Sequence, residues 1–148
     1  MEVVNLEELL LENQLCFPLY ATSKEIIRYY GPLLKPLNLT YTQYLVMLVL
    51  WEKKRTNVKE LGHLLCLDSG TLTPVLKKLA DKNYLERKRE PLDERILILT
   101  LTPTGDALQE KAKDIPTKIK DFLPLEPEEL TLLLQLTKKM LVHFEQDK

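Results

Sequence analysis

The sequence lacks any apolar run close to the roughly 20 residues that a membrane-spanning helix needs, and it contains only two cysteines, Cys16 and Cys66. These cysteines do not have metal-site spacing, and neither His63 nor His143 has a cysteine or carboxylate partner at ligand spacing. The N-terminal segment is acidic and amphipathic, without the basic start and apolar run of a signal peptide. We therefore expect a cytoplasmic protein in a reducing environment, with no disulfide framework, no metal or cofactor and no membrane partner.

The sequence also lacks internal repeats, low-complexity tracts and long linkers. Its 148 residues suit one domain, and 45% hydrophobic residues are enough for an ordinary core. The net charge is only −1, but residues 53–95 carry 11 basic and 7 acidic side chains, whereas residues 1–52 carry 3 and 6 and residues 96–148 carry 7 and 9. The central positive excess favours a polyanionic partner, although a solvated basic face would have the same composition.

Two helices are predicted before the basic segment. Apolar residues spaced by three and four predict helix over about 6–30. Pro18 either bends one long helix or lies in the first turn of a second one. The glycine and two prolines within 31–36 are expected to end this element. An unbroken apolar run then predicts a deeply buried helix, capped by Thr40 or Thr42.

The basic segment begins with two predicted short helices joined by a turn. Asn57 caps the first, which ends near Leu65, and the second ends near Lys82. The sequence does not decide where the second helix starts. A cap at position 73 would place the following proline at the first helical position, which proline favours, but two earlier residues also suit a cap. The three candidate caps are Asp68, Ser69 and Thr73.

A charged β-hairpin follows, with strands predicted at 84–89 and 96–101 around a turn at 90–94. Thr102 and Pro103 then start a helix that is predicted to continue to about residue 120, and a last helix is predicted over 128–144. Apolar helical stripes thus lie at both ends of the chain. They would pack inward in a monomer or against a second copy in a dimer, and we favour the dimer.

We predict a mainly α fold with a small β-hairpin wing, in a single domain over residues 1–148. Residues of about 40–102 would form a winged helix-turn-helix, and about 1–36 and 103–148 would form dimerisation helices. This arrangement is shaped to put one helix in a DNA major groove and the hairpin tip in a minor groove. The sequence therefore predicts a homodimer that binds palindromic double-stranded DNA.

Three motifs resemble those of the MarR family of winged-helix repressors. They are LDSGTLTPVLKKL at 67–79, DER at 93–95 and LTPTG at 101–105, and the likeness extends through nearly the whole chain. Within that family, LCF at 15–17, Tyr30 and LTY at 39–41 resemble the one-cysteine branch that senses organic hydroperoxides, the OhrR-like repressors. The resemblance implies a redox-responsive transcriptional repressor.

The resemblance also implies a set of DNA contacts. Those on the recognition helix, facing bases and phosphates, would be Ser69, Thr71, Thr73 and Lys77. Arg95 would enter the minor groove, oriented by Asp93, while Arg87, Lys88 and Arg89 hold the DNA backbone. Arginine suits a narrow minor groove because its planar guanidinium keeps its charge. Without a role in DNA binding, Asp93 would be an ordinary turn residue and Arg95 an exposed charge at the end of a strand.

Cys16 is the candidate reactive group, although a free cysteine is more often a small buried hydrophobe. Tyr30 and Tyr41 match positions that, by the resemblance, donate hydrogen bonds to the cysteine sulfur and so stabilise the thiolate, the nucleophile that attacks a peroxide. Cys16 and Tyr30 are 14 residues apart, which is roughly 21 Å on a continuous helix. A contact between them must therefore cross between two subunits, so sensing would require the dimer.

We predict that an organic hydroperoxide oxidises Cys16 to a sulfenic acid. A low-molecular-weight thiol would then cap it as a mixed disulfide, because no cysteine lies in the C-terminal half to resolve it. The adduct would displace the tyrosines and release the operator. Cys66, at the end of a predicted helix among leucines, is expected to be buried core, as are Tyr44 and Trp51.

Three alternatives stay open beside this regulator, which would not be an enzyme. The first is a MarR-type regulator relieved by a noncovalent small ligand. The second is a broader thiol-based stress or virulence regulator that responds to hydrogen peroxide. The third, from another class, is a thiol peroxidase, in which the basic hairpin would have no purpose.

Overall fold

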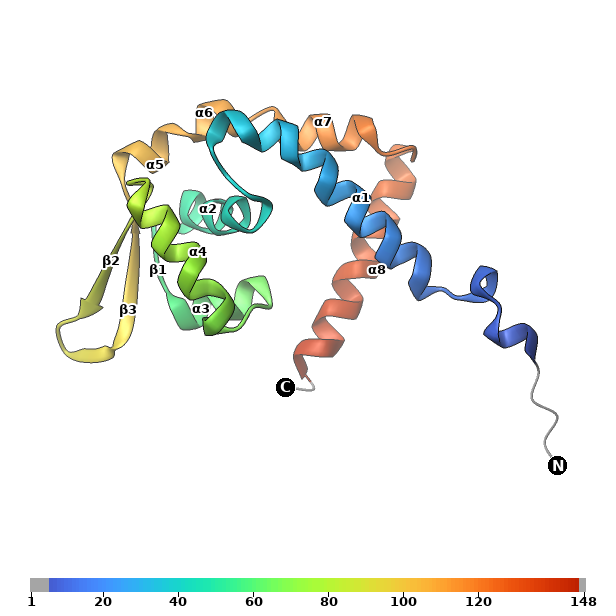
Figure 1. The fold of residues 1–148 in the computed structure, drawn as a ribbon, viewed down its shortest axis with the longest axis horizontal. Coiled ribbons are helices and arrows are strands. Elements are labelled where there is room, and N and C mark those ends of the chain that lie inside the picture. The colour runs from blue at the N-terminus through green and yellow to red at the C-terminus, as the bar shows by residue number, and fades with distance from the viewer. Residues whose placement is uncertain (1–5, 147–148) are drawn as a thin grey trace. The chain divides into compact units, whose positions relative to one another are not determined.

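The computed structural model describes residues 6–146 (Figure 1). The chain divides into two compact units, and the second begins at Asp114. The first unit contains η1 (Leu6–Leu9), η2 (Leu11–Asn13), α1 (Cys16–Leu34), η3 (Lys35–Leu37), α2 (Tyr41–Lys53), β1 (Arg55–Asn57), α3 (Val58–Leu65), α4 (Ser69–Asp81), β2 (Leu85–Glu90), β3 (Asp93–Leu101), α5 (Pro103–Ala107) and α6 (Gln109–Ala112). The second contains α7 (Ile115–Phe122) and α8 (Pro127–Gln146). No helix within the described range is long and apolar enough to cross a membrane.

The strands form one antiparallel sheet in the order β1-β3-β2. The predicted hairpin is confirmed as β2 and β3, and it projects from the helices with α5 at its base (Figure 1). The strands extend further toward the hairpin tip than predicted, because Glu90 pairs with Asp93 and only Pro91 and Leu92 form the turn. The third strand, β1, was not predicted: its three residues are too few to show the alternation of a strand.

The core of the first unit lies where α2, α3, α4 and the sheet meet. Its fully buried side chains are Leu34, Leu37, Val46, Met47, Leu50, Leu61, Leu72, Leu76, Leu79, Leu85 and Leu99. The predicted burial of Tyr44 and Trp51 is confirmed. The apolar run of α2 is not buried throughout, however, since Leu48 is 40% exposed. A helix turns 100° per residue, so no unbroken run can face one core.

The N-terminal helix begins later than predicted, at Cys16 rather than near Leu6. Asn13 donates its side-chain amide to the Glu7 carbonyl at 2.7 Å, and the Gln14 amide donates to two further carbonyls at 2.8 Å. These side chains replace the backbone donors that a continuous helix would use, and short 3-10 turns result. Pro18 therefore lies in the first turn of a new helix, where its missing N–H costs nothing.

The predicted helix break at 31–36 was misplaced, because α1 runs through Gly31 and Pro32 to Leu34. Pro32 has no N–H and so removes one backbone hydrogen bond near the end of α1. The helix continues beyond it, since the Lys35 N–H donates to the Gly31 carbonyl. The chain leaves the helical direction at Asn38, where φ is 56°. Helix α2 then starts at Thr40, whose hydroxyl and backbone form a reciprocal capping box with Gln43.

The helix predicted from Thr102 to about residue 120 is broken into α5, α6 and α7. Thr102 and Pro103 do start it, with the Gly105 N–H donating to the Thr102 hydroxyl at 3.0 Å. The final break follows from Pro116, which is favoured in a first helical turn and so begins α7. The last predicted helix is present as α8.

The caps of the helix-turn-helix come from short polar side chains. The side-chain amide oxygen of Asn57 accepts from the Glu60 N–H at 2.8 Å, as predicted, and the Asp68 carboxylate accepts from the Thr71 N–H at 2.6 Å. Asp68 is thus the cap of α4, and Pro74 lies within that helix. The Thr71 hydrogen bond lowers the pKa of Asp68 from its ordinary value of 3.8.

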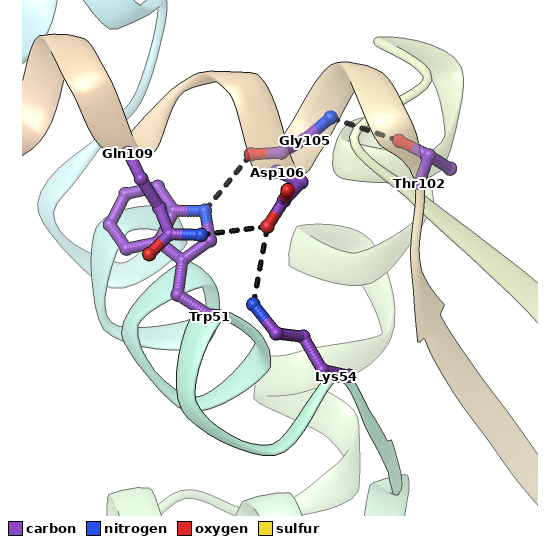
Figure 2. A network of polar contacts seen from close by, with 6 residues as sticks. All are labelled: Trp51, Lys54, Thr102, Gly105, Asp106 and Gln109. Carbon is purple, nitrogen blue, oxygen red and sulfur yellow. Dashed lines mark hydrogen bonds and ion pairs between the residues drawn. The ribbon is translucent and has the colours of Figure 1, made fainter.

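The base of the wing is held by a polar network between α2 and α5 (Figure 2). The Trp51 indole donates to the Gly105 carbonyl at 2.9 Å, in a buried hydrogen bond. Beside it, Asp106 accepts from Lys54 at 3.2 Å and from Gln109 at 2.7 Å. Gly105 must be glycine, since a Cβ there would lie 2.0 Å from the Tyr84 carbonyl oxygen.

We expect Gly105→Ala to lower the free energy of unfolding by about 2–3 kcal/mol, because the methyl group forces the wing base apart. Gly31→Ala is the matched control, since a Cβ at Gly31 meets nothing within 4 Å. It should be neutral or stabilising by up to about 1 kcal/mol. Urea denaturation followed by circular dichroism measures both variants, and equal losses would contradict the argument.

The lowered pKa of Asp68 predicts a pH-dependent contribution to stability. Because the pKa of Asp68 is lower in the folded protein than its unfolded value of 3.8, the ionised cap stabilises the folded state above pH 3.8. This contribution is lost as the pH falls through the folded pKa. Asp68→Asn keeps a capping oxygen that does not titrate. The melting temperature of the wild type should exceed that of the variant near neutral pH, and the gap should close as the pH falls below 3.8 and through the lower folded pKa of Asp68. A gap independent of pH would exclude this role.

Candidate functional site

Helices α3 and α4 form the predicted helix-turn-helix. The turn between them closes tightly, with the Leu67 N–H donating to the Gly62 carbonyl at 3.0 Å. Helix α4 buries three leucines against the core. Its predicted contact residues, Ser69, Thr71, Thr73 and Lys77, are all exposed. The Thr73 hydroxyl donates to the Ser69 carbonyl at 2.7 Å, which leaves its oxygen free to accept.

The wing carries the other predicted contact residues. Arg87, Lys88 and Arg89 are exposed on β2, but alternation along a strand places Lys88 on the face opposite to the two arginines. At the tip, Arg95 forms a two-pronged ion pair with Asp93, at 3.0 Å from Nε and 3.1 Å from Nη2. The predicted Asp93–Arg95 contact is therefore present.

The Asp93–Arg95 pair fixes both the charge and the direction of the guanidinium. Hydrogen bonding to Arg95 lowers the pKa of Asp93, and the same contact raises the pKa of Arg95. Arg95 is 90% exposed, so its remaining N–H groups face solvent. Arg95 is in this way a permanent positive charge held in one orientation at the wing tip.

A groove of about 630 Å³ runs between the start of α4 and the wing. Its lining residues are Asn57, Val58, Lys59, Ser69, Thr73, Arg89, Asp93, Arg95, Ile96 and Leu97. The structure thus brings five of the nine predicted contact residues into one concave surface. The other four, Thr71, Lys77, Arg87 and Lys88, are exposed outside it.

Lys59 in this groove was missed by the sequence reasoning. It is the second residue of α3, in the turn that follows the Asn57 cap, and it is exposed. The sequence showed only that Lys59 lies in the first turn of the helix capped by Asn57, and its place beside Ser69 and the wing is seen in the structure alone. The groove therefore has three cationic side chains, Lys59, Arg89 and Arg95.

Cys16 is the first residue of α1 and is exposed. No side chain caps this helix start, so its backbone N–H groups remain available to a negative charge on the cysteine sulfur. Tyr30 lies on the same uninterrupted helix, 14 residues further on, which is roughly 21 Å. The two residues cannot meet within one chain.

Tyr30 and Tyr41 form an aromatic cluster with Tyr44. The ring centroids of Tyr30 lie 4.8 Å from Tyr41 and 5.7 Å from Tyr44. Burial raises the pKa of Tyr30 to about 12, with further contributions from Tyr41 and Tyr44, and burial also raises the pKa of each of the other two. All three phenols therefore keep their protons, and remain donors, throughout the physiological pH range.

The prediction that Cys66 is buried core was wrong. It is exposed, and it ends α3 in a left-handed conformation with φ 57°. That conformation turns the chain away from the helix axis, so the apolar neighbours in the sequence do not enclose the thiol. Among residues 6–146, no group of three or more histidine, cysteine or acidic side chains forms a metal site.

The chain matches a known family over most of its length. The family model described as Transcriptional regulator SarA/Rot matches residues 28–115. The organic hydroperoxide resistance transcriptional regulator of Bacillus subtilis (strain 168) is 53% identical over 109 residues, which is 74% of each chain.

Solved structures share the fold. Reduced AbfR bound to DNA is 37% identical, with a TM-score of 0.77 over 93% of this chain and 96% of that one; AbfR comes from Staphylococcus epidermidis. Overoxidized AbfR has also been solved bound to DNA, with 39% identity and a TM-score of 0.73 over 91% and 97% of the two chains. A mutant MarR from E. coli complexed with operator DNA is 25% identical, with a TM-score of 0.74 over 93% and 94%.

The mainly helical fold, the small antiparallel sheet and these matches agree with one another. The predicted fold class is confirmed. The chain belongs to the SarA/Rot family of transcriptional regulators, within the MarR-type winged-helix proteins and their OhrR-like branch, and it is a DNA-binding transcriptional regulator.

Proposed function

We propose that this protein is a dimeric repressor that leaves a palindromic operator when an organic hydroperoxide oxidises Cys16. The observation that carries the redox part is the position of Cys16, exposed at a helix start with no side-chain cap. The name of the Bacillus subtilis relative supports organic hydroperoxide as the input. Because the proposed ligand is chromosomal DNA, the protein would act in the cytoplasm.

For DNA binding, the exposed face of α4 would enter the major groove, where Ser69, Thr71, Thr73 and Lys77 face bases and phosphates. Arg95 would enter the adjacent minor groove, whose negative potential favours arginine. Arg89 and Lys59 line the groove between α4 and the wing and would contact the DNA backbone. Arg87 and Lys88, which lie outside this groove on opposite faces of β2, would also hold the DNA backbone.

The proposed dimer rests on exposed apolar surface in both units. On α1 the exposed apolar side chains are Phe17, Leu19, Tyr20 and Ile27, and on α8 they are Leu132, Leu133, Leu134, Leu136, Met140, Leu141, Val142 and Phe144. Exposed apolar side chains in this number favour association with another chain. A second copy would also bring the Tyr30 and Tyr41 hydroxyls to Cys16, which one chain cannot do.

The proposed chemistry has two steps. The Cys16 thiolate attacks one peroxide oxygen, an S–O bond forms, the O–O bond breaks, and the alkoxide leaves as an alcohol after taking a proton. Sulfur is oxidised by two electrons, and the hydroperoxide is reduced to the alcohol. A small thiol then attacks the sulfenic acid, forming a mixed disulfide and releasing water.

Release of DNA would follow from the bulk of the adduct at the dimer interface, where it displaces the two tyrosines and changes the spacing of the wings. Reversing a 99:1 population needs about 5.5 kcal/mol of differential stability, which a covalent adduct in a packed interface can supply. Overoxidized AbfR is itself bound to DNA. The mixed disulfide, rather than a higher oxidation state, is therefore the form to test.

Arg95→Ala should weaken DNA binding by about tenfold or more and lower the slope of log affinity against log salt by about one. The matched control is Arg28→Ala, because Arg28 is an exposed arginine on α1 in a surface ion pair with Glu25. Its affinity should stay within about twofold of the wild type. Fluorescence anisotropy over a salt series gives both quantities, and equal effects of the two changes would exclude the wing-tip role.

A mobility shift on the DNA upstream of the protein's own coding region tests the redox switch. The reduced wild type should bind, and treatment with cumene hydroperoxide and a small thiol should release it. Cys16→Ser should stay bound after treatment, whereas Cys66→Ser, which removes the other exposed thiol, should be released like the wild type.

Other outcomes distinguish the alternatives. Release of Cys16→Ser by the hydroperoxide would favour a noncovalent inducer, and a stronger response to hydrogen peroxide would favour the broader stress regulator. Sustained consumption of hydroperoxide with excess thiol would favour a peroxidase. Any of these results would overturn the proposed switch.

A further inference from the structure

The three clustered tyrosines extend to a fourth aromatic ring, in the direction of the wing. Tyr44, only 4% exposed, packs edge-to-face against Trp51 with ring centroids 6.2 Å apart. Tyr44 also contacts Tyr30 and Tyr41. Tyr30, Tyr41, Tyr44 and Trp51, here called the aromatic cluster, therefore connect the end of α1 to the end of α2 without a gap.

Trp51 continues this connection into the base of the wing. Figure 2 shows its indole N–H pointing at the Gly105 carbonyl, and Gly105 in turn donating to the Thr102 hydroxyl. The Thr102 hydroxyl donates to the Asn83 carbonyl, and the Thr102 N–H donates to the Tyr84 carbonyl at 3.3 Å. Thr102 follows β3, and Asn83 and Tyr84 precede β2, so these bonds hold both strands of the hairpin at their base.

The connection has little freedom to absorb a displacement. Trp51 is 9% exposed, and Gly105 is pressed against Tyr84 so closely that a single added methyl group does not fit. Packed interiors transmit such shifts because they have no empty space to take them up. A displacement of Tyr44 is therefore passed through Trp51 to Gly105 by direct contacts, with no flexible segment between them.

We propose that the aromatic cluster and the Trp51–Gly105 hydrogen bond transmit displacement of Tyr30 and Tyr41 to the wing, which makes Trp51 a positioning residue for DNA release. The coupling runs inside one chain, in addition to any change at the dimer interface. It rests on the proposed function, since the adduct at Cys16 is the event that displaces the tyrosines.

The same two helices offer a matched comparison. Lys54 and Asp106 also bridge α2 and α5, but both side chains are more than half exposed. An exposed ion pair is weak and compliant, so it cannot carry the displacement. Lys54→Met removes this bridge and leaves the Trp51 contact intact, whereas Trp51→Phe removes the indole N–H and keeps an aromatic ring.

The experiment uses the full chain and labelled DNA from upstream of the coding region. Dissociation constants are measured for the reduced protein and for the Cys16 mixed disulfide made with cumene hydroperoxide and a small thiol, with the adduct confirmed by intact mass. For Trp51→Phe, the ratio of the two constants should fall about fivefold, the effect of one hydrogen bond. For Lys54→Met it should stay within about twofold of the wild type.

Trp51 supplies a second readout, because it is the only tryptophan in the sequence. Its fluorescence in the wild type should change when Cys16 acquires the adduct and should not change in Cys16→Ser under the same treatment. This measurement decides the question even if Trp51→Phe fails to fold by circular dichroism.

The outcomes separate the coupling from the function. If Trp51→Phe is released like the wild type, or if wild-type fluorescence is unchanged while DNA is released, the coupling is wrong and the redox repressor stands. If the wild-type adduct stays on DNA, the proposed function fails and the coupling falls with it. A ratio of dissociation constants that falls about fivefold for Trp51→Phe, together with a ratio for Lys54→Met within about twofold of the wild type, supports the coupling.

Discussion

The buried hydrogen bond from the Trp51 indole to the Gly105 carbonyl joins α2, at the centre of the core, to α5 at the base of the wing. Helix α2 supplies the centre of the core through Val46, Met47 and Leu50, and its last turn carries the indole that reaches α5. The Leu101 N–H donates to the Lys54 carbonyl at 2.9 Å in the same place. Since the groove needs α4 and the wing at a fixed separation, its shape depends on this junction.

The groove itself is assembled from short-range contacts placed on that frame. Asp68 caps α4 three residues upstream of its bond partner, and Asp93 holds Arg95 from two residues away. Contacts this local form with little loss of chain entropy, and they reduce the freedom that DNA binding would otherwise remove. In the proposed complex, electrostatic attraction to DNA would act on the Arg95 guanidinium, whose direction is already set by Asp93.

These local contacts are also what the sequence could reveal. The Asn57 cap and the hairpin follow from residue type and spacing alone, whereas the pairing of Asp93 with Arg95 was implied by the resemblance to the MarR family. The structure contains all three. The contact between Trp51 and Gly105 joins residues 54 positions apart, and no local pattern announces it. Strand β1 was missed for the same reason, since its partner Thr100 lies far along the chain. Cys66 was misjudged because its exposure depends on one backbone angle rather than on its apolar neighbours.

The helix ends have a further consequence for the durability of the fold. Four described residues with positive φ follow η3, α2, α3 and α4, and they are Asn38, Lys54, Cys66 and Asn83. None is glycine, although left-handed backbone costs other residues roughly 1–2 kcal/mol, with asparagine tolerating it best. The four glycines of the sequence all lie elsewhere, with φ outside that region. The left-handed conformations of Lys54 and Cys66 therefore lower the heat stability of the fold, and glycine at these helix ends would recover it away from the side chains proposed to contact DNA.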